Sequence, residues 1–255
     1  MTRNRIVARA VVTAGLAVTA SLAVALPAQA QVSRQVTCDG TIGAQTVGSV
    51  VVAAGTACVL DGTRVQGGIT VGAGAALDMS KTGVYGGVTS DRGGRVTAVD
   101  SVVRGGFDHT GNGQVRFTNS VVGGDVAVRG ETTFAATGLV VGGDLSGTAV
   151  SRFDVSGSSV RGSLVANEAF SGGDLCGNRV YGDAKVVGSG GAVLIGDAGS
   201  CAGNDVDGSV VVDNNVAYLV IAGNTIDHNL SCTGNDPAPV VGTNTVQGAK
   251  LGQCA

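Results

Sequence analysis

The sequence of 255 residues contains no tryptophan, only two histidines and only three prolines. Three tyrosines and five phenylalanines are its whole aromatic inventory, and few ordinary globular cores could be built from so few large rings. Two histidines leave almost no material for a histidine-based triad or a zinc site. Glycine is abundant, with 44 residues. The scarcity of proline nevertheless excludes collagen, and the frequent Val, Ile and Leu exclude a disordered chain.

The first thirty residues have the pattern of a secretory signal peptide. Three arginines precede a largely apolar run at 11–26, and residues 28–30 form an A-x-A cleavage site. No lipobox cysteine follows this run, and no later stretch approaches eighteen apolar residues. We therefore expect residues 1–30 to be removed and residues 31–255 to be exported without membrane attachment, either extracellular or associated with the cell wall.

The charge of the expected mature chain argues against nucleic acid as a partner. The formal net charge of the whole chain is −3, and residues 1–30 hold three basic and no acidic residues, so residues 31–255 carry about −6. A chain of that sign is repelled by the phosphate backbone.

A short unit, Val-x-Gly-x-apolar, repeats along the chain. Its six strongest copies are spaced by 19 residues and start at Val65, Val84, Val103, Val122, Val141 and Val160. Further copies start at Val180, Val206, Ile226 and Val246, with a degenerate first copy at Val47. The later spacings are 20, 26, 20 and 20 residues, so one coil alone carries an insertion. A fixed period of this length is typical of a solenoid.

A second apolar column follows each start by twelve and fourteen residues. Its members are Leu77 and Met79, Val96 and Ala98, Val115 and Phe117, Phe134 and Ala136, and Phe153 and Val155. Both columns alternate apolar with variable positions, which is the period of a β-strand. One unit cannot bury its own inner face, but stacked units build a continuous core. The pattern predicts a single-stranded right-handed parallel β-helix of about eleven coils of 19–20 residues.

The domain organisation follows from the repeat. We expect an N-terminal cap and first coil at 31–64, regular coils at 65–179, and longer, disulfide-bearing coils at 180–255. We interpret the glycine between the two apolar positions as leaving room in a narrow interior. On that interpretation Gly124→Val would be more harmful than Gly123→Val.

A small polar residue stands two places before almost every start. These residues are Thr63, Thr82, Ser101, Ser120, Ser158, Asn178, Asn204, Asn224 and Asn244, and Leu139 is the exception. Asparagine tolerates the left-handed turn conformation, and its amide can hydrogen-bond the same residue in a stacked copy. The column therefore predicts a hydrogen-bonded ladder at one corner of the helix.

Six cysteines in an exported chain suggest three disulfides, for which fifteen pairings are possible. The separations from Cys38 to Cys58, from Cys176 to Cys201 and from Cys232 to Cys254 are each close to one coil. Stacked coils bring residues one coil apart within about 4.8 Å, which a disulfide accepts. The repeat thus predicts sequential pairing.

Two segments resemble a group of secreted actinobacterial proteins described as right-handed parallel β-helix proteins with a pectate-lyase-like fold. They are Gly55-Thr-Ala-Cys58-Val-Leu60-Asp-Gly62 with the Val65 repeat unit after it, and Ser231-Cys232-Thr-Gly234-Asn235 through to Gly252-Gln-Cys254. The likeness extends over nearly all of residues 31–255. It implies the fold and export, and it assigns no catalytic residue. The coils also resemble those of bactofilins, which are polymerising β-helices that lack signal peptides and structural disulfides.

An outward column of carboxylates is the strongest candidate for chemistry. Strand alternation points Asp125, Asp144 and Asp183 away from the core, and Asp125 and Asp144 should be stacked neighbours about 5 Å apart. Such a spacing would suit a retaining glycosidase pair or calcium ligands. Because neither has an aromatic platform or enclosing loop nearby, we interpret the column as a solvated surface ladder. We expect no catalytic, cofactor or metal site.

His228 stands where the strong copies have glycine. It is either a titratable group near the core or the mark of a local change of register in a degenerate coil, and we favour the second interpretation.

Two classes of function remain. The favoured one is an exported, non-enzymatic structural or surface/matrix protein whose long rod either displays a face or associates with a cell-wall or extracellular polysaccharide. The alternative is a polysaccharide lyase or glycoside hydrolase, by analogy of fold alone. Six turns of minimal, equal length leave no place for the long loops that form the clefts of such enzymes. The pattern assigns no oligomeric state.

Overall fold

The computed structural model describes residues 35–197 and 199–255. Within them the chain forms 34 strands and no helix, and therefore no helix able to cross a membrane. The predicted signal peptide, residues 1–30, lies outside the described residues.

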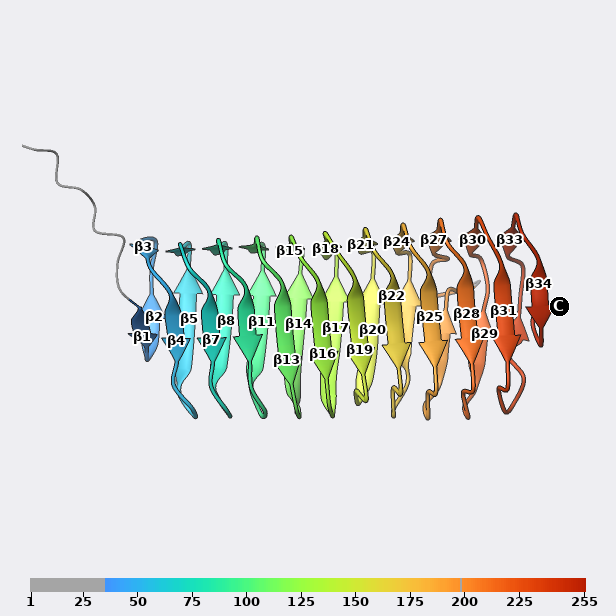
Figure 1. Cartoon of the computed structure of the whole chain (residues 1–255), viewed down its shortest axis with the longest axis horizontal. Helices are drawn as coiled ribbons and strands as arrows, with labels where there is room; N and C mark the ends of the chain where they lie inside the picture. Colours follow the sequence, from blue (N-terminus) through green and yellow to red (C-terminus); the bar gives the residue numbers. More distant parts are fainter. Residues whose placement is uncertain (1–34, 198) are drawn as a thin grey trace, which may run out of the picture. The chain divides into compact units, whose positions relative to one another are not determined.

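The strands form three parallel sheets, and each coil contributes one strand to each sheet (Figure 1). Sheet A has 12 strands: β1 (Val36–Cys38), β4 (Val50–Val52), β7 (Ile69–Val71), β10 (Val88–Ser90), β13 (Phe107–Thr110), β16 (Val126–Arg129), β19 (Leu145–Thr148), β22 (Leu164–Asn167), β25 (Ala184–Val187), β28 (Val210–Asp213), β31 (Leu230–Thr233) and β34 (Lys250–Gly252). Sheet B has 11 strands: β2 (Gly40–Ile42), β5 (Ala57–Asp61), β8 (Ala76–Ser80), β11 (Arg95–Val99), β14 (Gly113–Thr118), β17 (Thr132–Thr137), β20 (Arg152–Ser156), β23 (Gly173–Cys176), β26 (Val193–Ile195), β29 (Leu219–Ile221) and β32 (Val240–Val241). Sheet C has 11 strands of two residues: β3 (Thr46–Val47), β6 (Arg64–Val65), β9 (Gly83–Val84), β12 (Val102–Val103), β15 (Val121–Val122), β18 (Val140–Val141), β21 (Ser159–Val160), β24 (Arg179–Val180), β27 (Asp205–Val206), β30 (Thr225–Ile226) and β33 (Thr245–Val246).

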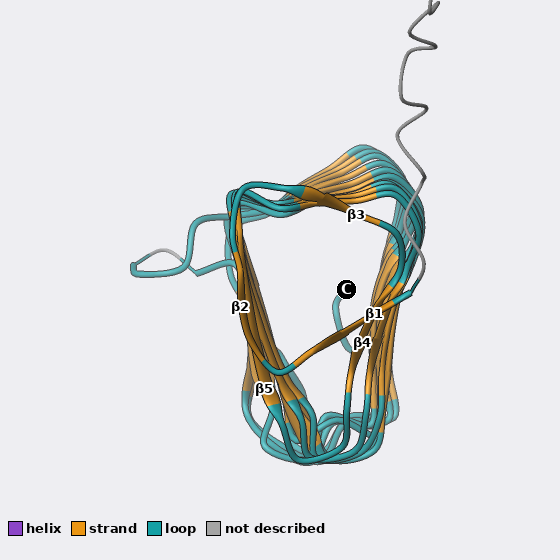
Figure 2. Ribbon diagram, turned by 90° about the vertical axis from the view of Figure 1, so that its left-hand side faces the viewer, coloured by secondary structure: helices purple, strands orange, loops and turns teal. Residues whose placement is uncertain are grey.

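The repeat unit spans the corner between sheets C and A. Its valine ends a strand of sheet C, and its second apolar residue begins a strand of sheet A, as Val122 and Val126 do. Residues 19 apart are in register, so Val103 pairs with Val122 and Phe107 with Val126. The predicted parallel β-helix of about eleven coils is confirmed, and the three sheets enclose one core (Figure 2).

The widest side chains of the core gather in the middle coils. Phe107, Phe117, Phe134 and Phe153 are all buried, and their rings form a continuous row. The Phe134 and Phe153 rings stack with centroids 5.0 Å apart, and the Phe117 ring contacts Phe134 at 6.2 Å. Gly147 borders this row, because a side chain there would run into the Phe153 ring.

The predicted polar ladder is confirmed at the corner between sheets B and C. All of its members are buried, and backbone N–H groups donate to the ladder side chain of the following coil. Asn204 shows the fullest pattern: it accepts from the backbone of Asn178 at 3.0 Å, and its own amide donates to Leu175 O at 2.7 Å. The left-handed residue is the one before the ladder, for example Asn119 with a φ of 47°. The predicted turn conformation is therefore displaced by one residue.

A second ladder, buried except at its last member, follows the strands of sheet A in the last coils. The backbone N–H of Ser189 donates to Asn215 Oδ1, that of Asn215 to Asn235 Oδ1, and that of Asn235 to Gln253 Oε1. The sequence reasoning missed it, although Ser189, Asn215 and Asn235 have the same separations as the repeat starts. At the corners the backbone N–H groups no longer take part in the hydrogen bonding of the sheets. The side chains of both ladders accept hydrogen bonds from these groups.

The interpretation of the repeat glycines is wrong. A Cβ at Gly124 would lie 3.0 Å from the backbone nitrogen of Gly106, and a Cβ at Gly123 would lie 2.4 Å from Arg104 O. Both would point along the helix axis into the preceding coil, because the corner turns the Cα–Cβ direction out of the plane of the coil. Glycine therefore allows close stacking of coils, and the expected order of harm between Gly124→Val and Gly123→Val is reversed.

The cysteines pair sequentially, as the repeat predicted. Cys38–Cys58, Cys176–Cys201 and Cys232–Cys254 have Cα–Cα distances of 5.5, 4.8 and 5.3 Å, and no cysteine is free among the described residues. The partners are not strictly equivalent: the register partner of Cys58 is Gly40, and that of Cys232 is Gly252. The bonds thus join the two end coils and the insertion to their neighbours.

The single insertion falls at 196–204, between β26 and β27. Its described residues project beyond the three-sided cross-section (Figure 2), and the Cys176–Cys201 bond links them to the last residue of β23.

Candidate functional surfaces

The acidic column lies at the corner between sheets C and A. Asp125 and Asp144 occupy equivalent positions in successive coils, but Ser163 separates Asp144 from Asp183. Each carboxylate accepts a hydrogen bond from the backbone N–H of the next coil: Asp125 from Asp144 at 2.9 Å, Asp144 from Ser163 at 2.8 Å, and Asp183 from Ser209 at 2.9 Å.

The same ladder continues with uncharged side chains. Ser163 accepts from the backbone of Asp183, Ser209 from that of Asn229, and Asn229 from that of Ala249. Serine and asparagine substitute for aspartate, so the position selects a short side chain with an acceptor oxygen and not a carboxylic acid. We therefore assign it a role in joining coils.

The electrostatics of Asp183 support that role. The hydrogen bond from the Ser209 backbone lowers the pKa of Asp183, and the ammonium of Lys185 lies 3.0 Å from its second oxygen. A general acid requires a raised pKa, whereas the pKa of Asp183 is lowered.

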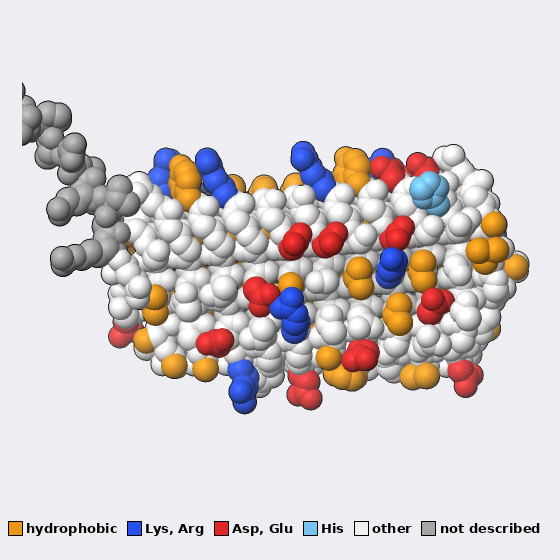
Figure 3. Space-filling view, viewed as in Figure 1, with side chains coloured by type: hydrophobic (Ala, Val, Ile, Leu, Met, Phe, Trp, Pro, Cys, Tyr) orange, Lys and Arg blue, Asp and Glu red, His pale blue; other side chains and the backbone are white. Residues whose placement is uncertain are grey.

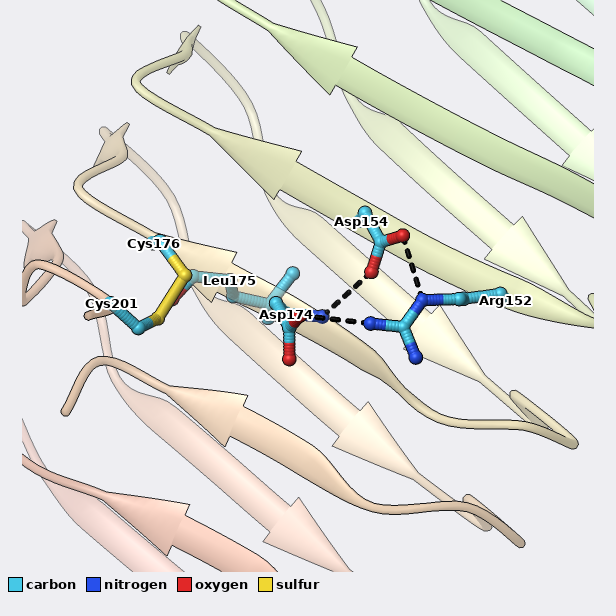
Figure 4. Close-up of polar contacts among 6 residues, drawn as sticks. All are labelled: Arg152, Asp154, Asp174, Leu175, Cys176 and Cys201. Carbon is cyan, nitrogen blue, oxygen red and sulfur yellow. Dashed lines mark hydrogen bonds and ion pairs between the residues drawn. A yellow bond between two sulfur atoms is a disulfide. The ribbon is translucent and has the colours of Figure 1, made fainter.

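A second carboxylate group lies on sheet B around Arg152 (Figure 4). Arg152 Nε donates to Asp154 and Nη2 to Asp174, both at 2.8 Å, while the Asp174 backbone donates to Asp154 at 3.1 Å. The hydrogen bond with Asp154 raises the pKa of Arg152. One guanidinium thus binds both carboxylates, and the cluster links β20 to β23 next to the Cys176–Cys201 bond.

The two histidines lie in opposite environments. His109 is buried in β13, with Nδ1 3.0 Å from Ser90 Oγ and with no partner for Nε2 among the described residues. His228 is exposed. The favoured change of register at His228 is wrong, because Ile226 and Leu230 pair with Val206 and Val210 in the regular frame. His228 simply replaces an outer corner glycine.

Burial of His109 makes the stability of the fold dependent on pH. Burial lowers the pKa of His109, against the opposing effects of the Asn112 backbone and the Asp108 and Asp91 carboxylates. As pH falls below the unfolded value of about 6.5, the unfolded chain takes up the proton first, so stability declines by up to about 1.4 kcal/mol per pH unit until the folded pKa is reached.

We expect His109→Val to remove this component of the acid dependence, because valine occupies the same position in the next coil, at Val128. Denaturant unfolding at pH 7.5 and pH 5 measures it, and His228→Gln is the matched control that should keep the wild-type dependence. Equal losses in the wild type and His109→Val would contradict the assignment.

The outer face of sheet C carries aromatic, basic and acidic side chains. The Arg104 guanidinium lies 4.2 Å from the centroid of the Tyr85 ring, and Arg64 donates to the Tyr85 hydroxyl at 3.2 Å. In the other half, Arg179 lies 5.0 Å from the Tyr181 ring and pairs with two carboxylates, Asp205 and Asp207.

The outer surface also has open depressions. One lies over β10, β13 and β16 on sheet A and is lined by Thr89, Asp108, Asp125, Ala127 and Arg129, among others. An ion pair of 2.5 Å joins Arg129 to Asp108 at its edge. Nowhere in 35–197 or 199–255 do three His, Cys, Asp or Glu side chains gather as metal ligands would.

The fold and these surfaces define a disulfide-linked parallel β-solenoid with open, solvated faces. Comparisons with protein-family models, with curated proteins and with solved structures found no match.

Proposed function

We propose that this chain is an exported, non-enzymatic structural protein of the cell surface or extracellular matrix, whose flat faces bind a cell-wall or extracellular polysaccharide. The observation that carries the proposal is the hydrogen bonding of Asp125, Asp144 and Asp183 to the backbone of the next coil. The carboxylates that could have served as a glycosidase pair have a structural use. The three disulfides support export, because such bonds persist in oxidising compartments.

The depression on sheet A is the contact that we assign to the polymer. Thr89, Asp108 and Arg129 offer donors and acceptors to sugar hydroxyls. Successive coils repeat the backbone every ~4.8 Å, so a polymer with a regular repeat can meet several coils at once, and weak contacts add up.

The experiment uses protein recovered from the medium of cells that express the full chain, where an N-terminus at Gln31 is expected. Co-sedimentation with pectate, alginate, chitin and peptidoglycan should detect binding to at least one of these polymers. Arg129→Gln should weaken that binding. Arg95→Gln should not, since it breaks a similar exposed pair, with Asp78, on sheet B. Retention of the chain inside the cells, failure to bind all four polymers, or equal effects of the two variants would count against the proposal.

Turnover is tested on the same polymers by following new reducing ends and unsaturated products, with and without calcium. No product is expected. Asp125→Asn and Asp144→Asn keep the acceptor oxygen of the ladder, so they remove the charge with little effect on the fold. Product formation that disappears in either variant would replace this proposal with the glycan-cleaving alternative.

A further inference from the structure

The outer face of sheet C changes its charge along the helix axis. The outer face of sheet C lies along the upper edge of the view in Figure 1 and Figure 3. Lys and Arg side chains stand over the first two thirds of this edge, and Asp and Glu side chains stand near its far end (Figure 3). The basic residues are Arg64, Arg104 and Arg161, after or in β6, β12 and β21. The acidic ones are Asp205, Asp207 and Asp227, in or after β27 and β30.

The charged side chains at the two ends of this face also differ in the ion pairs that they form within the chain. Arg64, Arg104 and Arg161 have no carboxylate partner within the described part of the chain, whereas Arg179 alone serves both Asp205 and Asp207. Each end therefore keeps an excess of one sign. A single-sign excess at each end of one flat face is complementary to the same face turned end for end.

The middle of the face is apolar and uneven. Val102, Val121 and Val140 are about two fifths exposed, at 42, 36 and 41%. Beside them Gly123 and Gly142 leave two successive coils without a side chain, while Arg161 and the half-exposed Tyr181 stand out in the next two coils. Two coils without protruding side chains at this position thus lie next to two coils that carry them.

We propose that sheet C is the interface of an antiparallel dimer of this chain. The twofold axis lies in the interface between β18 and β21, parallel to the strands. It places β12 of one copy opposite β27 of the other, β15 opposite β24, and β18 opposite β21. Arg104 then meets Asp207 of the second copy, Tyr181 lies opposite Gly123, and the two Arg161 side chains lie opposite Gly142 on either side of the twofold axis.

The opposite polarity is excluded by charge. In a parallel dimer each coil would face its own equivalent, so the basic coils around Arg104 would meet each other and the acidic coils around Asp207 would meet each other. Like charges opposed across an interface cost several kcal/mol.

The area suits a reversible dimer. From β6 to β33 the face is about 43 Å long at ~4.8 Å per coil, and four extended residues make it about 13 Å wide, so the pair would bury about 1,100 Å². That is at the lower end for specific interfaces. We therefore expect a micromolar dissociation constant that increases with salt.

Sedimentation velocity over a concentration series up to about 100 µM, at low and high salt, measures the association. Val140→Lys places a charge at the centre of the interface and should weaken the dimer at least tenfold. Val59→Lys, at an equally exposed valine of sheet B (38%), should leave it unchanged.

A mixing experiment tests the polarity. Arg104→Glu and Asp207→Lys should each be monomeric alone, because both cross-pairs of each homodimer become repulsive. An equimolar mixture should dimerise again, since the heterodimer restores both pairs. Arg116→Glu on sheet B is the control variant.

Several outcomes would overturn the proposal. They are a monomer at every concentration, a dimer insensitive to Val140→Lys, stronger association of Arg104→Glu alone, and no recovery on mixing. Loss of polysaccharide binding by sheet C variants of a monomeric protein would identify the polymer as the occupant of this face. A dimer without any bound polysaccharide would support this inference and contradict only the proposed function.

Discussion

Replacement of Phe134 by alanine is expected to lower the free energy of unfolding by about 3–5 kcal/mol, the range typical of a buried phenylalanine. Phe134 is fully buried and stacks on Phe153, with Phe117 on its other side. The walls of the core cannot close around the cavity, because every strand is hydrogen-bonded to the coils before and after it. Urea unfolding followed by circular dichroism measures the effect.

Phe170→Ala provides the matched control, since it removes the same side chain from an exposed position (54%). Its effect should stay within about 0.5 kcal/mol, as for most surface substitutions. Equal midpoints for the two variants would mean that the phenylalanine row is not the centre of the core.

Gly142→Ala is expected to destabilise the fold by about 2 kcal/mol or more, although Gly142 is exposed. The added Cβ would lie 2.1 Å from the carbonyl oxygen of Gly123 and 2.9 Å from its carbon, so one coil must move away from the next. Such a movement is costly, because the backbone of each coil is hydrogen-bonded to the coils on both sides. Thermal unfolding is the simplest measurement.

Gly83→Ala is the comparison, because nothing lies within 4 Å of the Cβ that it would add. It should be neutral or stabilising by roughly 0.4–1 kcal/mol, since alanine has fewer unfolded conformations than glycine. If Gly83→Ala proved as harmful as Gly142→Ala, coil stacking would not be the reason for glycine at the corners.

Several features of the fold could be predicted because a repeat turns one local pattern into a global one. A strand period and a spacing of 19 residues require that Val103 stack on Val122, and stacking makes the core continuous. The same spacing located the buried ladder through Asn178 and Asn204 and paired the cysteines. The second ladder, through Asn215 and Asn235, carried the same signal in fewer copies and was missed.

The candidate site could be predicted only in part. The outward position of Asp125 and Asp144 follows from alternation, but their hydrogen bonds to the next coil depend on the angle of the corner, which no linear pattern contains. Burial of His109 was missed because a histidine at an inward position is indistinguishable in sequence from a variable residue.

The sequence by itself thus determined the parallel β-helix, its length in coils and its disulfide pairing, because period and spacing are properties of the chain. Only the tertiary structure decided which way the corner glycines face, which carboxylates bind backbone, and how charge is distributed along sheet C. These depend on where each Cα–Cβ bond points once the chain turns. At a corner, that direction is set by contact with the neighbouring coil and not by the order of residues.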